Sequence, residues 1–137
     1  MRCECASCGG EITGLAHIGV MVRDIEASLR FYVEALGFEV TDRADMGEVK
    51  LAFLNIGSCL LELVQTPDAS PREAGPVDHI AMEVKDIDAL MCRLTDRGVK
   101  FASESASHSP SLLGGVKNVF FAGPDGEKLE FFEYVGG

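Results

Sequence analysis

The chain has 137 residues, 47% of them hydrophobic, and a net charge of −10, which is typical of one globular domain that builds its own core. The acidic balance leaves no basic footprint, so we expect no nucleic-acid partner. No apolar run approaches the ~18 residues of a membrane span, and residues 1–10 lack the apolar core of a signal peptide. We therefore expect a cytoplasmic protein without a membrane partner.

Residues 1–13 form a cysteine-containing N-terminal tail. Cys3, Cys5 and Cys8 lie close together, and the chain has five cysteines in all. An odd count argues against a disulfide framework, and a structural zinc site requires four ligands where this segment offers three thiols. We interpret the tail as carrying reduced thiols, whose role the sequence leaves open.

An internal repeat organises residues 14–137 into one domain of two modules, at about 14–66 and 77–135. The segment His17-Ile-Gly-Val-Met-Val-Arg-Asp-Ile-Glu-Ala recurs 62 residues later as His79-Ile-Ala-Met-Glu-Val-Lys-Asp-Ile-Asp-Ala. Two similar units in tandem indicate a duplicated supersecondary structure. The polar segment between them, 66–76, is predicted to be the linker.

In the first module, the branched residues of 15–22 predict a strand. Asp24 is then a helix N-cap, and Gly37 occupies the position that follows a helix end. The apolar stripe of the helix is Ile25, Leu29, Tyr32 and Leu36. Three further strands are predicted at 38–43, 48–55 and 58–65.

The second module repeats this order. A strand at 77–84 precedes the N-cap Asp86, and the helix carries its stripe to Gly98. Strands are predicted at 100–102, 116–121 and 128–134, with a Ser-rich loop at 103–115 and a turn at 123–126. The fold class is therefore α+β, with two tandem βαβββ modules.

Four residues stand out as candidate metal ligands. His17 and His79 lie at equivalent places in the first strand of each module, and Glu62 and Glu130 lie in the last strands among apolar neighbours. A single strand histidine or glutamate is usually a hydrogen-bonded or solvated residue. A carboxylate inside an apolar strand is costly unless paired or metal-bound, so the matched pairs predict a site for a divalent ion.

The repeat and its paired His and Glu residues resemble the vicinal oxygen chelate superfamily, which includes glyoxalases, bleomycin-resistance proteins and dioxygenases. The resemblance covers about 14–135 and is carried by His17-Ile-Gly-Val, Phe31-Tyr32, Leu36-Gly37-Phe38, Val49-Lys-Leu-Ala-Phe53, Glu62-Leu63, Asp78-His-Ile-Ala81 and Gly123-Pro-Asp-Gly-Glu127. It implies an open, metal-centred barrel and a homodimer with sites near the interface. The cofactor is one divalent ion per site, which is nickel, cobalt, zinc, manganese or iron; no other cofactor is expected.

The His/Glu/His/Glu set is similar to that of glyoxalase I, the lactoylglutathione lyase. The resemblance implies a lyase or isomerase that moves a proton α to a carbonyl or hemithioacetal through a metal-stabilised enediolate. Glu130 is then the catalytic base, with Glu62 as the alternative. Met21 and Thr66 stand where glutathione-binding members carry arginine and asparagine, so the thiol partner of the small-molecule substrate is open.

Three other functions are weighed against this one. A methylmalonyl-CoA epimerase-like enzyme would act on a thioester by the same kind of proton transfer. A ring-cleaving dioxygenase would use two histidines and one glutamate, and Glu62 as a fourth ligand argues against it. A non-catalytic drug-binding resistance protein suits the charge of −10 but not the retained ligand set.

Overall fold

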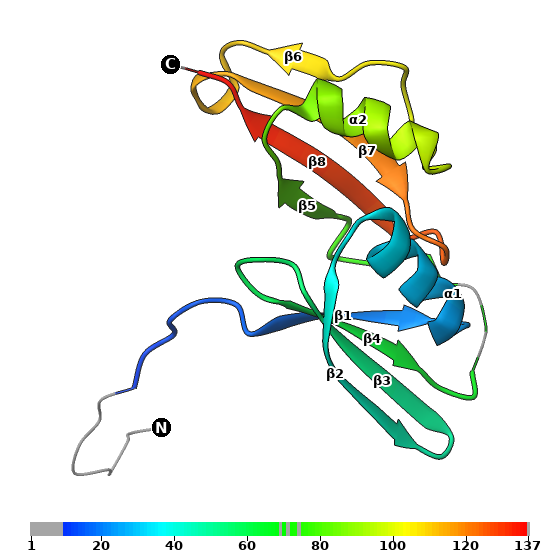
Figure 1. Ribbon diagram of the computed structural model, residues 1–137. Coiled ribbons are helices and arrows are strands. Elements are labelled where there is room, and N and C mark those ends of the chain that lie inside the picture. Colours follow the sequence, from blue (N-terminus) through cyan, green and yellow to red (C-terminus); the bar gives the residue numbers. More distant parts are fainter. Residues whose placement is uncertain (1–9, 69, 71, 74, 137) are drawn as a thin grey trace.

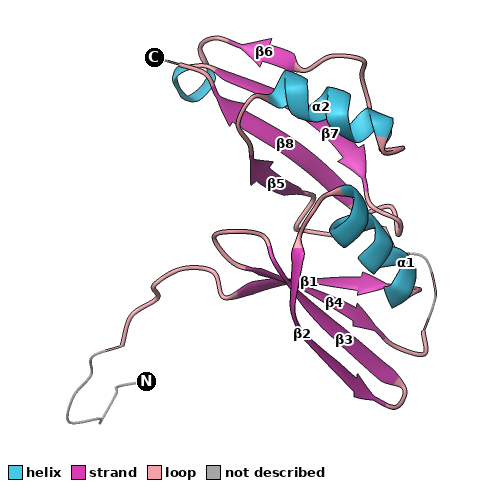
Figure 2. Ribbon diagram, viewed as in Figure 1, coloured by secondary structure: helices cyan, strands magenta, loops and turns pink. Residues whose placement is uncertain are grey.

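The computed structural model describes residues 10–68, 70, 72–73 and 75–136. Cys3, Cys5 and Cys8 lie outside the described residues. The chain forms two four-stranded mixed sheets, and one helix lies against a face of each (Figures 1 and 2). None of the helices in the described part is long and apolar enough to cross a membrane.

The first sheet has the strand order β1-β4-β3-β2, with β1 parallel to β4 and the other neighbours antiparallel. Its elements in chain order are β1 (His17–Val22), α1 (Ile25–Leu29), a π-helical turn (Arg30–Ala35), β2 (Glu39–Met46), β3 (Val49–Asn55) and β4 (Leu60–Gln65).

The second sheet repeats this topology as β5-β8-β7-β6, again with its first and last strands parallel. Its elements are β5 (Ile80–Glu83), α2 (Ile87–Asp96), β6 (Ser107–Ser109), a 3₁₀ turn (Leu112–Gly114), β7 (Val116–Ala122) and β8 (Lys128–Tyr134). The α+β class and the duplicated βαβββ unit are confirmed. Within the chain the two sheets are separate and are not closed into a barrel.

The helix boundaries follow the predicted capping residues. The Asp24 carboxylate accepts hydrogen bonds from the backbone N–H groups of Glu26 and Ala27, and the Asp86 carboxylate accepts one from Ala89. Gly37 and Gly98 have φ angles of 87° and 92°, the left-handed conformation that ends a helix at low cost.

Two elements differ in detail from the sequence prediction. The first helix continues after Leu29 as a π-helical turn in which the N–H of Leu36 bonds to the carbonyl of Phe31. The wider turn changes the angular step between residues, so Leu36 is only half-buried although it belongs to the predicted stripe.

The predicted strand at 100–102 is reduced to a single bridge between Phe101 and Phe121. A serine turn, in which the Ser103 hydroxyl donates to the carbonyl of Ser105, interrupts the sheet edge there. The edge resumes as β6 inside the segment expected to be a loop.

One hydrophobic core joins the two modules on the helix side of the sheets. Phe31, from the first module, lies 6.4 Å from Phe121 of the second, ring centroid to centroid. Ile18, Val20 and their counterparts in β5 pack against this core, which leaves the histidine faces of both strands pointing away from it.

Hydrogen bonds connect the β7–β8 turn to the first module. We call this contact, between Asp125 and Glu127 on the turn and Arg23, Ser28 and Tyr32 of the first module, the joint. The Arg23 Nε donates to Asp125 Oδ1 at 2.9 Å, and the Ser28 hydroxyl contacts the other oxygen of Asp125 at 3.4 Å. The fully buried Tyr32 donates its hydroxyl to Glu127 Oε2 at 2.7 Å. Burial, together with the nearby Glu127, raises the pKa of Tyr32, so the phenol stays a donor.

We expect Tyr32→Phe to lower the free energy of unfolding by about 1.5 to 3 kcal/mol, because a hydrogen bond to a charged, partly buried carboxylate is lost. Urea denaturation measures this. Tyr134→Phe is the matched control, since it also removes one phenol hydroxyl but none of the hydrogen bonds of the joint, and should change stability by less than about 0.5 kcal/mol. Equal effects in both variants would contradict a stabilising joint at Tyr32.

Candidate metal centre

The first half-site lies on the exposed face of β1 and β4. His17 Nε2 is 3.5 Å from Glu62 Oε1. The parallel pairing of the two strands aligns Glu62 with Gly19, two residues after the histidine. Because Gly19 has no side chain, the carboxylate lies over the strand, and a Cβ built on Gly19 would be 3.7 Å from Glu62 Oε1.

The second half-site has the same construction at β5 and β8, except that His79 directly precedes β5, which begins at Ile80 and not at residue 77 as predicted. His79 Nε2 is 3.3 Å from Glu130 Oε1, and Glu130 is aligned with the small residue Ala81. Glu130 is only 5% exposed, so the second carboxylate is the more buried of the two.

An aromatic ring completes each half-site. Phe53 pairs with Glu62 across β3 and β4, and Phe120 pairs with Glu130 across β7 and β8. Each ring meets its histidine edge to face, at centroid distances of 6.1 and 5.6 Å respectively. The duplication therefore preserves a triplet of histidine, glutamate and phenylalanine.

The second half-site has hydrogen bonds that the first lacks. Asn118 donates to Glu130 Oε2 at 2.8 Å, and Asp78 Oδ2 lies 2.9 Å from His79 Nδ1. Lys128 donates to the same Asp78 oxygen at 3.3 Å. Hydrogen bonds from His79 and then Lys128 hold the pKa of Asp78 below its usual range, so its carboxylate is ionised at neutral pH.

The equivalent positions in the first module cannot make these bonds. Ala16 precedes His17 where Asp78 precedes His79, and Leu51 and Leu60 take the places of Asn118 and Lys128 in the matching strand registers. The two half-sites thus share their ligands but differ in the groups around them.

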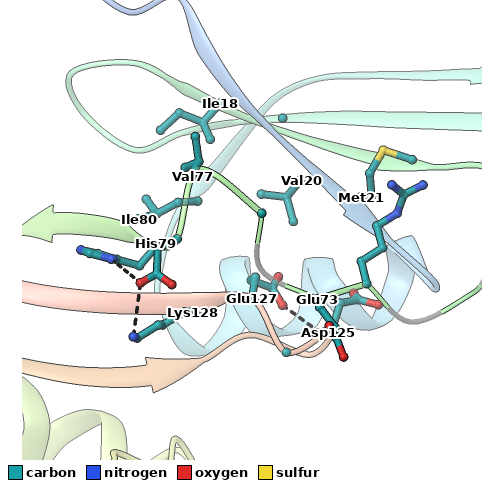
Figure 3. A pocket seen from close by; sticks show the side chains of 15 residues that line it. Ile18, Val20, Met21, Glu73, Val77, His79, Ile80, Asp125, Glu127 and Lys128 are labelled. Carbon is teal, nitrogen blue, oxygen red and sulfur yellow. Dashed lines mark hydrogen bonds and ion pairs between the residues drawn. The ribbon is translucent and has the colours of Figure 1, made fainter.

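Two cavities adjoin the second half-site. One, of about 330 Å³, is lined by both ligands His79 and Glu130 and by Phe132, Tyr134 and Leu113. The other, of about 260 Å³, lies between β1 and the start of β5, with Ile18, Val20 and Lys128 among its walls (Figure 3). The first cavity gives a small molecule access to the predicted ligands.

The four predicted ligands therefore meet as two pairs. Within residues 10–68, 70, 72–73 and 75–136, no three His, Cys, Asp or Glu side chains gather closely enough to hold a metal ion. Two imidazole nitrogens and two carboxylates are a suitable donor set for a divalent ion, but in one chain each sheet presents half of that set.

Sequence reasoning missed the residues that support the ligands. Asp78 lies in the motif Asp78-His-Ile-Ala81, and its position directly before His79 was the signal that could have indicated a contact with the histidine. Lys128 precedes Glu130 by two residues, which places both on one strand face. Asn118 and the two phenylalanines depend on cross-strand register, which the sequence alone does not supply.

A crystal structure of a glyoxalase family protein from Enterococcus faecalis matches the fold with a TM-score of 0.75 at 28% sequence identity. The match covers 88% of this chain and 98% of that one. The similarity therefore extends over both modules.

Sequence comparison gives the same relationship. YwbC, an uncharacterized protein of Bacillus subtilis, is 37% identical over 122 residues, which span 85% of this chain and 94% of that protein. A lactoylglutathione lyase of Neisseria meningitidis is 32% identical over 130 residues, 90% of this chain and 92% of that enzyme. Methylmalonyl-CoA epimerases are also relatives. The sequence profile of the Glyoxalase/Bleomycin resistance protein/Dioxygenase superfamily matches residues 14–131, and the chain belongs to this superfamily.

Proposed function

We propose that the protein is a metal-dependent, glyoxalase I-like lyase or isomerase whose divalent ion is held by His17, Glu62, His79 and Glu130. The observation that carries the proposal is the pair of matching His–Glu contacts, 3.5 and 3.3 Å long, at the same register of two sheets. If these histidines and glutamates had only a structural role in the core or on the surface, the two contacts would not need the same register and length.

The site is completed, in this proposal, by a second copy of the chain. Each sheet offers two ligands, whereas a closed site needs both pairs. Leu15 and Val77, which lie two residues before the two histidines, are 71% and 79% exposed. Leu113 and Tyr134 are exposed beside the second pair. A homodimer in which the first pair of one protomer faces the second pair of its partner covers these apolar residues.

The proposed reaction moves one proton between adjacent carbons of a small substrate, the hemithioacetal of a thiol. A divalent ion at this site supplies Lewis-acid polarisation of the substrate oxygens. Glu130 takes the proton from the hemithioacetal carbon and delivers it to the neighbouring carbon, which was the carbonyl carbon, while the hydroxyl proton moves to the neighbouring oxygen, so atoms and charge balance over the cycle. Its place in the wall of the 330 Å³ cavity supports this role; Glu62 is the alternative base.

The epimerase-like alternative differs in substrate and in where the proton returns: an acyl-CoA thioester would receive it on the opposite face of the same carbon. Ring cleavage and drug binding would not require Glu62 as a ligand. The cytoplasmic location also stays a prediction.

We expect purified protein loaded with divalent metals to hold about one ion per chain, as a site of two imidazoles and two carboxylates should. His79→Ala and Glu62→Ala should each lose it, measured by elemental analysis. His108→Ala is the control, because His108 lies exposed on β6. Binding that survives Glu62→Ala but not His79→Ala would favour a three-ligand dioxygenase; no binding in the intact protein would favour a drug-binding module.

Mixing two defective chains tests the shared site. A hybrid dimer of His17→Ala and His79→Ala protomers contains one site with both substitutions and one with neither. Co-refolded mixtures should therefore recover roughly a quarter of the wild-type metal content, whereas each variant alone holds none. If mixing restores no metal, the ligands come from a single chain.

We expect Glu130→Gln to lower kcat by roughly 10² to 10⁴, the usual contribution of a positioned base, in assays with methylglyoxal hemithioacetals of several thiols and with acyl-CoA thioesters. Glu62→Gln is the matched variant and should cost less in kcat. Metal content is measured alongside, so that loss of the ion is separated from loss of the base. A larger loss in Glu62→Gln would reverse the assignment.

A further inference from the structure

The imidazole of His79 is contacted on both of its nitrogens. Its Nδ1 is 2.9 Å from Asp78 Oδ2, and its Nε2 is 3.3 Å from Glu130 Oε1. The ring also meets Phe120 edge to face at 5.6 Å. Three neighbours thus restrict the position and rotation of this ring.

The contact with Asp78 determines which nitrogen carries the proton. An ionised carboxylate can only accept hydrogen bonds, so Nδ1 must be the protonated nitrogen for this bond to form. In the neutral ring, Nε2 then carries a lone pair directed at Glu130. Two lone pairs that converge at 3.3 Å form an arrangement that a bound cation stabilises.

Lys128 holds Asp78 in this position. Its ammonium lies 3.3 Å from the Asp78 oxygen that faces His79, and 4.8 Å from the centroid of the Phe120 ring. Figure 3 shows His79 and Lys128 joined by dashed lines through that carboxylate. The ring that packs against His79 therefore also supports the lysine.

The first half-site provides a natural comparison. Ala16 and Leu60 occupy the positions of Asp78 and Lys128. Among the described residues, Glu62 is the carboxylate recorded beside the His17 ring, and it faces Nε2 at 3.5 Å. The carboxylate contact is thus a property of the second module and not of the duplicated unit.

We propose that Asp78, held by Lys128, is a positioning residue that fixes the Nδ1–H tautomer of His79 and presents its Nε2 to the metal. The inference rests on the proposed metal-dependent function and makes the second half-site the preorganised one. A carboxylate behind a ligating histidine orients the ring and increases its basicity as a ligand.

The first arm of the test measures tautomers in the metal-free protein by long-range ¹H–¹⁵N NMR, at a pH where the imidazoles are neutral. We expect His79 to show a protonated Nδ1 in the wild type and to lose this preference in Asp78→Ala. His17 serves as the internal reference and should not change. Asp78→Asn keeps a neutral oxygen acceptor and should give an intermediate result, which keeps the test valid if the alanine variant folds poorly.

The second arm measures Mn²⁺ affinity from the electron paramagnetic resonance signal of the free ion, because Mn²⁺ prefers oxygen ligands to thiolates. We expect Asp78→Ala to bind roughly 10-fold to 100-fold more weakly. Asp88→Ala is the control: Asp88 is a similarly exposed carboxylate that is paired with Lys117 at 2.8 Å and lies away from the histidine, so affinity should stay within about twofold.

The two arms separate the two proposals. An unchanged His79 tautomer in Asp78→Ala overturns the positioning role, even if the protein binds metal. A tautomer that depends on Asp78 in a protein that binds neither Mn²⁺ nor any divalent ion in the elemental analysis supports the positioning role and overturns the metal site. Loss of affinity in Asp88→Ala equal to that in Asp78→Ala would attribute the effect to net charge and contradict the inference.

Discussion

The candidate site depends on the register of one parallel strand pair in each module. The first and last strands lie side by side, so the glutamate of one is aligned with the residue two positions after the histidine of the other. A slip of one residue would move every side chain of the strand to the opposite face. Glu62 and Glu130 would then enter the apolar core, where an unpaired carboxylate is strongly unfavourable. The core therefore enforces the register that brings the ligands together.

The joint between the modules sets the second constraint. Contacts of Tyr32 and Arg23 with the β7–β8 turn fasten the helix side of one module to the other, and a shared core lies behind them. On that side the apolar side chains of both modules are buried against each other within one chain. What it leaves open are the two histidine faces, each flanked by an exposed aliphatic residue, Leu15 or Val77.

Much of this could be predicted from the sequence because it is local. Capping by Asp24 and Asp86 and the glycines after the helices depend on a few neighbouring residues, and the repeat pointed to the candidate ligands by comparison within the chain. The π-helical turn and the interrupted edge at Phe101 could not be predicted, since the composition of both segments suits the regular element. The separation of the candidate ligands into two pairs could not be predicted for a different reason. It depends on how two modules dock, which strand periodicity does not encode.

The residues that hydrogen-bond to the candidate ligands could not be predicted from the sequence either. Asn118 and Glu130 are twelve residues apart in the chain and meet only through the β7–β8 pairing. The two modules carry the same candidate ligands, a histidine and a glutamate, whereas the residue before the histidine is Asp78 in one module and Ala16 in the other. Symmetry in a sequence therefore locates a site more reliably than it describes how the two halves behave.

The joint has a consequence for how damage spreads. In the proposed dimer, every protomer lends one ligand pair to each of two sites, and Tyr32 and Glu127 fix the spacing between those pairs. In a mixed dimer, a protomer with a loosened joint would contribute one misplaced pair to each site. Both sites would then be defective, although the partner supplies an intact pair to each. In a cell that makes both versions of the chain, the variant would therefore inhibit the wild-type protein by forming mixed dimers with it.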